Sequence, residues 1–120
     1  MQIFDRDLKI NFVDENNVFL GYDLQQDCCE HADWFIADTE QEQPLESGHG
    51  DYGGLKDFVF DTGFIKEIKP SDCEDGGMAI FRITNGVRER FIHIYNSHNG
   101  YYGHGFEFGI SQEVKRAGTL

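Results

Sequence analysis

The segment MAIFRITNGVRERFIHIY, residues 78–95, indicates two β-strands joined by a tight turn. Apolar residues, many of them β-branched or aromatic, recur through Met78–Thr84 and Val87–Tyr95, and this composition is typical of strands. Asn85-Gly86 lies between the two runs. This dipeptide is the strongest short-range hairpin signal, because a type I′ turn needs positive φ at both central residues. We therefore predict a β-hairpin here.

A second Asn-Gly dipeptide, at residues 99 and 100, extends the pattern toward the C-terminus. If both turns contain two residues, three strands form an antiparallel meander, and their registers follow from the turns. The predicted strands are Met78–Thr84, Val87–Tyr95 and Tyr102–Ile110. The predicted opposite pairs are Ile80–Phe91 and Arg82–Glu89 for the first turn, and Phe91–Phe108, His93–Phe106 and Tyr95–His104 for the second.

Alternation along these strands predicts a sheet with two apolar faces, because successive side chains point to opposite sides. The aromatic face would hold Met78, Ile80, Phe91, His93, Tyr95, His104, Phe106 and Phe108. The aliphatic face would hold Ala79, Phe81, Ile83, Ile92 and Ile94. Such a sheet must be covered on both sides. We expect the N-terminal strands to cover one face and the segment around Trp34 to cover part of the other.

The chain of 120 residues and 13.8 kDa is long enough for one core, so we expect a single domain over residues 1–120. The predicted fold is mainly β (α+β at most): an antiparallel sandwich or small open barrel with little helix. The other predicted elements are strands at Leu8–Val13 and Val18–Tyr22, helical turns around Cys28–Ala32, a strand at Trp34–Ala37, a polar loop at Thr39–Gly54, and a strand at Asp57–Lys69 with a bend near Gly63.

The charge is strongly negative and unevenly distributed. The chain has 22 acidic and 10 basic residues, a formal net charge of −12, and the stretch 10–55 contains acids but no Lys or Arg. This field would repel nucleic acids and anionic membranes and attract a basic protein partner. The alternative is a solvated acidic face that only maintains solubility. The predicted partner-binding residues are Asp27, Glu30, Asp33, Asp38, Glu40, Glu42 and Glu46, with His98 and Tyr101 as packed contacts at the hairpin tip.

The three cysteines, at positions 28, 29 and 73, do not form a disulfide framework, because their number is odd and two of them are adjacent. We expect Cys28 and Cys29 not to be bonded to each other, and at least one of them to be buried beside Trp34. Reduced thiols indicate a reducing compartment. No N-terminal signal sequence and no apolar run long enough to cross a bilayer are visible, so we expect a cytoplasmic protein.

Several residues have side chains that could bind zinc: Cys28, Cys29, His31, His98 and His104. The spacing argues against a zinc site, because adjacent cysteines point to opposite faces of a strand or lie about 100° apart on a helix. We therefore expect no cofactor and no catalytic residues, and keep zinc as the alternative. A small metal- or thiol-dependent enzyme would use the same cysteine and histidine residues.

Two segments, DCCEHADW at 27–34 and NSHNGYYGH at 96–104, resemble a group of small bacteriophage and prophage proteins. In that group a Cys-Cys pair precedes a Trp, and a His-Asn-Gly-Tyr-Tyr turn lies near the C-terminus. The resemblance implies a phage-related setting and carries no activity. The predicted function is therefore a small acidic binding protein that inhibits a host defence or nucleic-acid-handling protein by occupying its basic surface, in the host cytoplasm. A phage accessory or structural protein is a further alternative.

Overall fold

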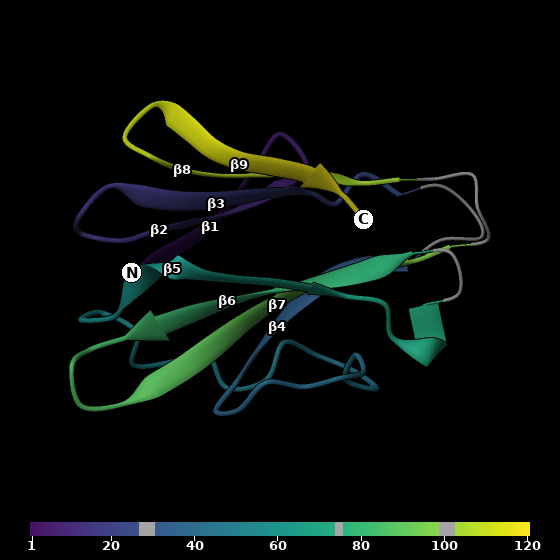
Figure 1. The fold of residues 1–120 in the computed structure, drawn as a ribbon, viewed down its shortest axis with the longest axis horizontal. Coiled ribbons are helices and arrows are strands. Elements are labelled where there is room, and N and C mark those ends of the chain that lie inside the picture. Colours follow the sequence, from purple (N-terminus) through teal and green to yellow (C-terminus); the bar gives the residue numbers. More distant parts are fainter. Residues whose placement is uncertain (27–30, 74–75, 99–102) are drawn as a thin grey trace.

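The computed structural model describes residues 1–26, 31–73, 76–98 and 103–120, and these residues form nine strands in two antiparallel sheets. The sheets lie face to face as an open sandwich, which confirms the mainly β prediction (Figure 1). The elements are β1 (Gln2–Arg6), β2 (Lys9–Val13), β3 (Val18–Asp23), β4 (His31–Ala37), β5 (Val59–Ile68), the 3₁₀ turn η1 (Ser71–Cys73), β6 (Gly77–Thr84), β7 (Glu89–Ser97), β8 (Gly105–Ile110) and β9 (Glu113–Thr119).

The chain builds the two sheets in three passes. Strands β1, β2 and β3 start a five-stranded sheet of order β1-β2-β3-β8-β9, and the chain then crosses to a four-stranded sheet of order β4-β7-β6-β5. It finally returns to the first sheet with β8 and β9. The predicted strands at Leu8–Val13 and Val18–Tyr22 are confirmed as β2 and β3. The predicted bend near Gly63 is confirmed as a register shift in the β5–β6 pairing between Phe60 and Ile65.

The main core fills the space between the sheets. Phe81 of β6 lies 6.0 Å from Phe106 and 5.3 Å from Phe108 between ring centroids, which joins the two sheets at their centre. Phe12 of β2 meets the ring of Trp34 edge-on at 5.3 Å. Such aromatic pairs add about 0.5–1.5 kcal/mol each beyond the area that they bury. The residues predicted for the aliphatic face all lie in this core: Ala79, Phe81, Ile83, Ile92 and Ile94.

A second apolar cluster lies on the outer face of the four-stranded sheet, so the central strands β6 and β7 are buried on both sides as expected. Its buried members are Phe35, Met78, Ile80, Phe91 and Tyr95. The loop of residues 38–54, called the acidic loop below, crosses this face and packs Leu45 against the cluster (Figure 1). The prediction that the segment around Trp34 covers this face is wrong, because that segment is itself strand β4.

The predicted helical turns around Cys28–Ala32 are wrong where the structure describes them. His31 and Ala32 begin strand β4, and residues 27–30 lie outside the described part of the chain. The cause is alternation: Ala32, Trp34 and Ile36 all point into the main core, which is a period of two. A helix would have turned these side chains to different sides.

The β6–β7 hairpin is confirmed, but its loop has four residues instead of two. Thr84 pairs with Glu89 and Ile80 with His93, so the predicted pairs Ile80–Phe91 and Arg82–Glu89 are wrong. The Asn85 side chain explains the longer loop, because its Oδ1 accepts hydrogen bonds from the backbone amides of residues 87 and 88 at 3.0 and 2.8 Å. A shift of two residues preserves the faces, and the assignment of side chains to faces within this hairpin therefore holds.

The predicted pairing of β7 with β8 is wrong. The neighbours of β7 are β4 and β6, and β8 pairs with β3 and β9 in the other sheet. The proposed pairs Phe91–Phe108, His93–Phe106 and Tyr95–His104 therefore do not form; Phe91 packs in the outer cluster and Phe108 in the main core. Alternation along a strand determines which face each side chain occupies, but it does not determine which strand lies beside it. The second Asn-Gly, at 99–100, lies outside the described residues.

The turn between β1 and β2 offers a stabilising substitution. Its two central residues, Asp7 and Leu8, have φ angles of 53° and 64°, and the Leu8 side chain is 63% exposed. This left-handed backbone costs a non-glycine residue roughly 1–2 kcal/mol, and glycine adopts it freely. We expect Leu8→Gly to raise the free energy of unfolding by about 1 kcal/mol in urea titrations. Leu8→Ala, which keeps the backbone penalty, is the control; equal stability of the two variants would contradict the prediction.

Candidate functional site

The acidic loop carries four of the predicted partner-binding residues: Asp38, Glu40, Glu42 and Glu46. A fifth, Asp33, lies on β4 beside it. The loop is long for a small protein, and long connections in compact folds are usually functional or disordered. Here the loop is held in place by buried polar groups on the strands beneath it.

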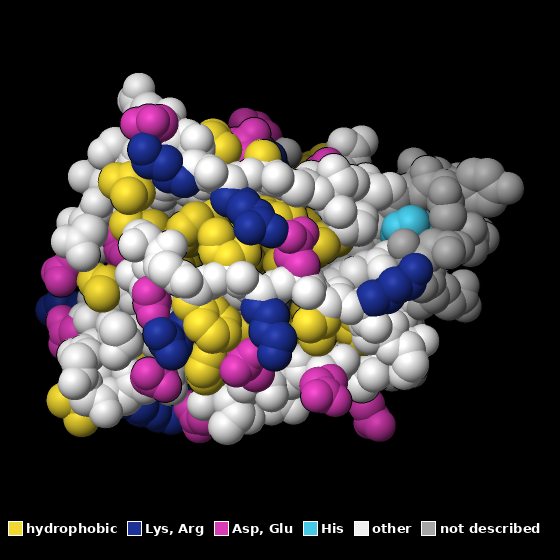
Figure 2. Space-filling view, viewed as in Figure 1, with side chains coloured by type: hydrophobic (Ala, Val, Ile, Leu, Met, Phe, Trp, Pro, Cys, Tyr) yellow, Lys and Arg dark blue, Asp and Glu magenta, His cyan; other side chains and the backbone are white. Residues whose placement is uncertain are grey.

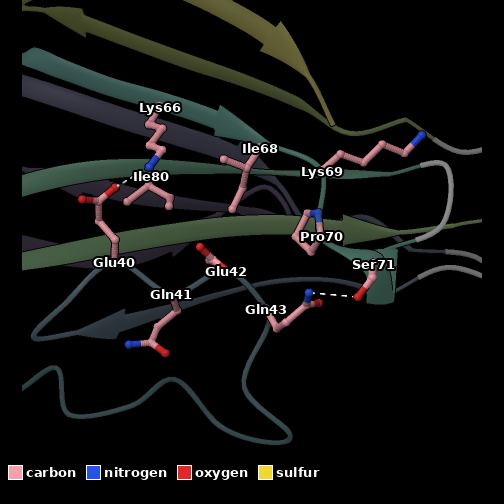
Figure 3. A pocket seen from close by; sticks show the side chains of 10 residues that line it. All are labelled: Glu40, Gln41, Glu42, Gln43, Lys66, Ile68, Lys69, Pro70, Ser71 and Ile80. Carbon is pink, nitrogen blue, oxygen red and sulfur yellow. Dashed lines mark hydrogen bonds and ion pairs between the residues drawn. The ribbon is translucent and has the colours of Figure 1, made fainter.

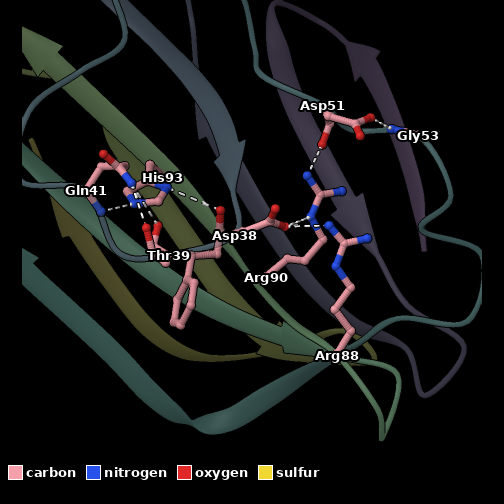
Figure 4. Close-up of polar contacts among 9 residues, drawn as sticks. Asp38, Thr39, Gln41, Asp51, Gly53, Arg88, Arg90 and His93 are labelled. Atoms are coloured by element: carbon pink, nitrogen blue, oxygen red, sulfur yellow. Dashed lines mark hydrogen bonds and ion pairs between the residues drawn. The ribbon is translucent and has the colours of Figure 1, made fainter.

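His93 of β7 is the first of these groups. Its ring has no exposed surface, stacks on Phe35 at 4.2 Å and 8°, and accepts a hydrogen bond at Nε2 from the Gln41 backbone amide at 2.9 Å (Figure 4). Nδ1 lies 3.2 Å from the Phe91 carbonyl oxygen and donates to it in the neutral tautomer that this network assigns. Burial lowers the pKa of His93 to about 4, so the ring is neutral at physiological pH.

Arg90 of β7 is the second group, and its side chain is only 3% exposed. It donates to the backbone carbonyl of Asp51 and, at 3.1 Å, to the carboxylate of Asp38, so it joins both ends of the acidic loop (Figure 4). An uncompensated buried charge is costly, and these contacts supply the compensation. Arg90 therefore fixes the loop relative to the sheet.

The loop also pairs with the free edge of β4. The Ile36 amide donates to the His49 carbonyl at 2.8 Å, and Gly50 forms a parallel bridge with Ile36. A Cβ atom at Gly50 would lie 2.2 Å from the Ile36 carbonyl oxygen, and φ there is +70°, so this contact requires glycine. The His49 ring stacks on Trp34 at 4.0 Å and 6°. These contacts cover part of an edge that would otherwise be open to another chain.

Three of the predicted acids have polar partners, and for Asp38 and Glu40 these are basic residues from outside the stretch 10–55. Asp38 lies 2.7 Å from Arg88 and 3.1 Å from Arg90, and Glu40 lies 3.1 Å from Lys66. Asp33 accepts the Trp34 amide and lies 3.4 Å from His49 Nδ1. On the side of the molecule in Figure 2, basic side chains accordingly lie beside acidic ones.

Glu42 and Glu46 are the exceptions, because both are exposed and neither forms an ion pair with any described residue. Each lines a groove beside the loop. The first groove, of about 450 Å³, separates the loop from the end of β5 and from η1 (Figure 3). Its lining residues are Glu40, Gln41, Glu42, Gln43, Lys66, Ile68, Lys69, Pro70, Ser71 and Ile80. The second, of about 260 Å³, is lined by His31, Pro44, Leu45, Glu46, Tyr95 and Ser97.

Two histidines of the alternative zinc site, His31 and His104, contact residues of different strands. His31 contacts the Tyr95 hydroxyl at 3.1 Å on the outer face of the four-stranded sheet, and His104 Nδ1 lies 2.6 Å from the Asp23 carbonyl at the end of β3. Within the described ranges, no group of three or more His, Cys, Asp or Glu residues could hold a metal ion. Asp27, Cys28, Cys29, Glu30 and Tyr101 lie outside those ranges, so the predictions about the two thiols and about Tyr101 remain predictions.

The sequence did not reveal the structural roles of three buried polar residues, Asp14, Arg90 and His93. His93 carried a signal, since it interrupts the apolar run between Ile92 and Ile94.

A buried tyrosine adds a link across the core: the Tyr22 hydroxyl donates to the Tyr95 carbonyl at 2.8 Å, and burial raises the Tyr22 pKa. Burial likewise raises the pKa of Tyr95 to about 12.

Comparison of the chain with protein-family models, with curated proteins and with solved structures gives no match. Among the described residues there is no helix with the length and apolar character needed to cross a membrane.

Proposed function

We propose that this protein acts by binding, and that the acidic loop with its two grooves docks on a basic surface of another protein. One observation carries the proposal. The carboxylates of Glu42 and Glu46 have no ion-pair partner among the described residues, and each lies beside a groove. Both are on a loop whose backbone is hydrogen-bonded to His93 and Arg90 of the sheet beneath it. A binding surface that is already ordered loses less conformational entropy when the partner binds.

The net charge of −12 supports a basic protein as the partner, since a field of this sign opposes nucleic acids and anionic membranes. The resemblance of segments 27–34 and 96–104 to phage proteins supports a partner in the host cell. The protein would then be an antagonist of a host defence or nucleic-acid-handling protein, acting in the host cytoplasm by covering its basic surface. His98 and Tyr101 would add packed contacts that slow dissociation.

A pair of charge-matched variants tests this proposal. Glu42→Gln/Glu46→Gln removes the two loop carboxylates that have neither a hydrogen bond nor an ion pair with any described residue, and Asp5→Asn/Glu107→Gln removes two exposed acids from the five-stranded sheet. Both variants and the unchanged protein are used to capture proteins from a bacterial lysate, and binding kinetics are then measured on the captured partner at low and high salt. We expect the loop variant to bind roughly five-fold more weakly at low salt, with slower association, and the control to bind as before.

Two results would contradict the proposal. Equal weakening by both variants would mean that only the overall field attracts the partner. Unchanged binding by the loop variant at both salt concentrations would mean that the partner docks on another surface.

A further inference from the structure

The larger of the two grooves combines an apolar floor with polar ends. Ile80, part of the outer cluster, and Ile68 of β5 form the floor, and Pro70 stands beside them (Figure 3). An ion pair between Glu40 and Lys66 at 3.1 Å closes one end. At the other end, Gln43 Nε2 donates to the Ser71 hydroxyl at 3.0 Å. The volume of about 450 Å³ falls within the range of ligand pockets, about 300–1,000 Å³.

Among the described residues that line this groove, Glu42 and Lys69 have charged side chains without an ion pair, and only that of Glu42 is directed into the groove. Lys66 neutralises Glu40, and the Lys69 side chain extends away from the groove in Figure 3. The Glu42 carboxylate is turned into the groove and has no hydrogen bond or ion pair with any described residue. A single carboxylate above an aliphatic floor suits a ligand with an apolar stem and one positive charge.

We propose that this groove binds a lysine side chain of the basic partner, an inference that rests on the proposed function. The methylene stem would pack on Ile68, Ile80 and Pro70, and the ammonium group would bind Glu42. Lysine buries its stem on apolar surface while its charged end stays at a polar rim. The donors of an ammonium group radiate from one point, so Ser71 on a separate element can also accept from it. The donors of an arginine guanidinium lie in one plane as a fixed fork, so they match acceptors on two separate elements less well.

A titration with a single side chain isolates this site from the rest of the acidic surface. Nα-acetyl-lysine methylamide is added to ¹⁵N-labelled protein up to about 50 mM, which detects complexes weaker than millimolar. We expect saturable shifts of the amide signals of Gln43, Ile68 and Ser71. The norleucine and Nε-acetyl-lysine analogues, which lack the charge, should not bind, and the arginine analogue should bind more weakly.

Two single variants locate the charge. Glu42→Gln should weaken binding of the lysine analogue roughly five-fold, and Glu46→Gln, with the same charge change on the same loop, should leave it unchanged. The unfolding midpoint of each variant is measured first, to show that the fold is intact. Both substitutions are at exposed positions without a bonded partner among the described residues, so the midpoints should not move.

Three results would overturn the inference: no saturable shift at the groove, tighter binding of the arginine analogue, or equal weakening by Glu42→Gln and Glu46→Gln. Its failure is separable from that of the proposed function. If the lysine analogue does not bind the groove but the double loop variant loses the captured partner, the lysine site is wrong and the docking loop stands. If the analogue binds but the double variant keeps the partner, the groove is real and the proposed function is wrong.

Discussion

Replacing Asp14 by alanine is expected to lower the free energy of unfolding by roughly 3 kcal/mol. Asp14 lies in the turn between β2 and β3 and is 4% exposed. Its Oδ1 accepts the amides of Asn16 and Val18 at 2.9 Å each, and its Oδ2 accepts the Phe60 amide at 2.8 Å. This carboxylate therefore joins a turn of the five-stranded sheet to β5 of the other sheet. Without it, two buried amides lose their acceptor.

Urea unfolding at neutral pH measures the effect, and two further variants define its cause. Asp14→Asn keeps one carbonyl oxygen for Asn16 and Val18 but turns an amide donor toward Phe60, so we expect about half of the loss. Glu15→Ala removes the same charge from the exposed neighbouring residue and should change stability by less than about 0.5 kcal/mol. An Asp14→Ala variant as stable as Glu15→Ala would show that the carboxylate does not hold the sheets together.

The sequence was sufficient to predict most of the strands and the two faces of β6 and β7, because both follow from local alternation; strands β1 and β9 were not predicted. Phe81 and Ile92 point into the core, and Ile80 and Phe91 point outward, as the period of two requires. The sequence was insufficient to predict which strands are neighbours. A strand such as β8 can bury its aromatic side chains either beside β7 in the same sheet or across the core from it. In the structure, Phe106 and Phe108 lie across the core and contact Phe81.

The site was predictable only in part, for a related reason. A run of acids without local bases is visible in the sequence, but the bases that neutralise Asp38 and Glu40 come from elsewhere in the chain. Arg88 and Arg90 lie 50 and 52 residues from Asp38, and Lys66 lies 26 residues from Glu40. Ion pairs of this separation depend on the sandwich as a whole. What distinguishes Glu42 and Glu46 from the other acids is therefore a property of the fold.

Acidification is expected to destabilise the protein through His93. The folded-state pKa of about 4 lies below the ordinary value of 6.5, because burial disfavours the charged ring. Between these two values the unfolded chain binds more protons at this residue than the folded protein does. The neutral His93 ring therefore makes its full contribution to the free energy of unfolding above pH 6.5. This contribution is lost as the pH falls toward 4, by about 3 kcal/mol in total. Protonation would also place a donor where Nε2 accepts the Gln41 amide, so the acidic loop should detach first.

Urea unfolding of His93→Gln across this pH range isolates the effect from the carboxylates that titrate nearby. The glutamine carbonyl can accept the Gln41 amide but does not titrate, so we expect the variant to lose less stability than the unchanged protein between pH 6.5 and 4. His31→Gln is the matched control, since His31 is exposed and bonded only to the Tyr95 hydroxyl among the described residues. It should retain the full pH dependence. Hydrogen exchange at Gln41 should accelerate on acidification in the unchanged protein before global unfolding begins. Parallel stability curves for His93→Gln and the unchanged protein would show that His93 is not the group that makes the fold sensitive to acid.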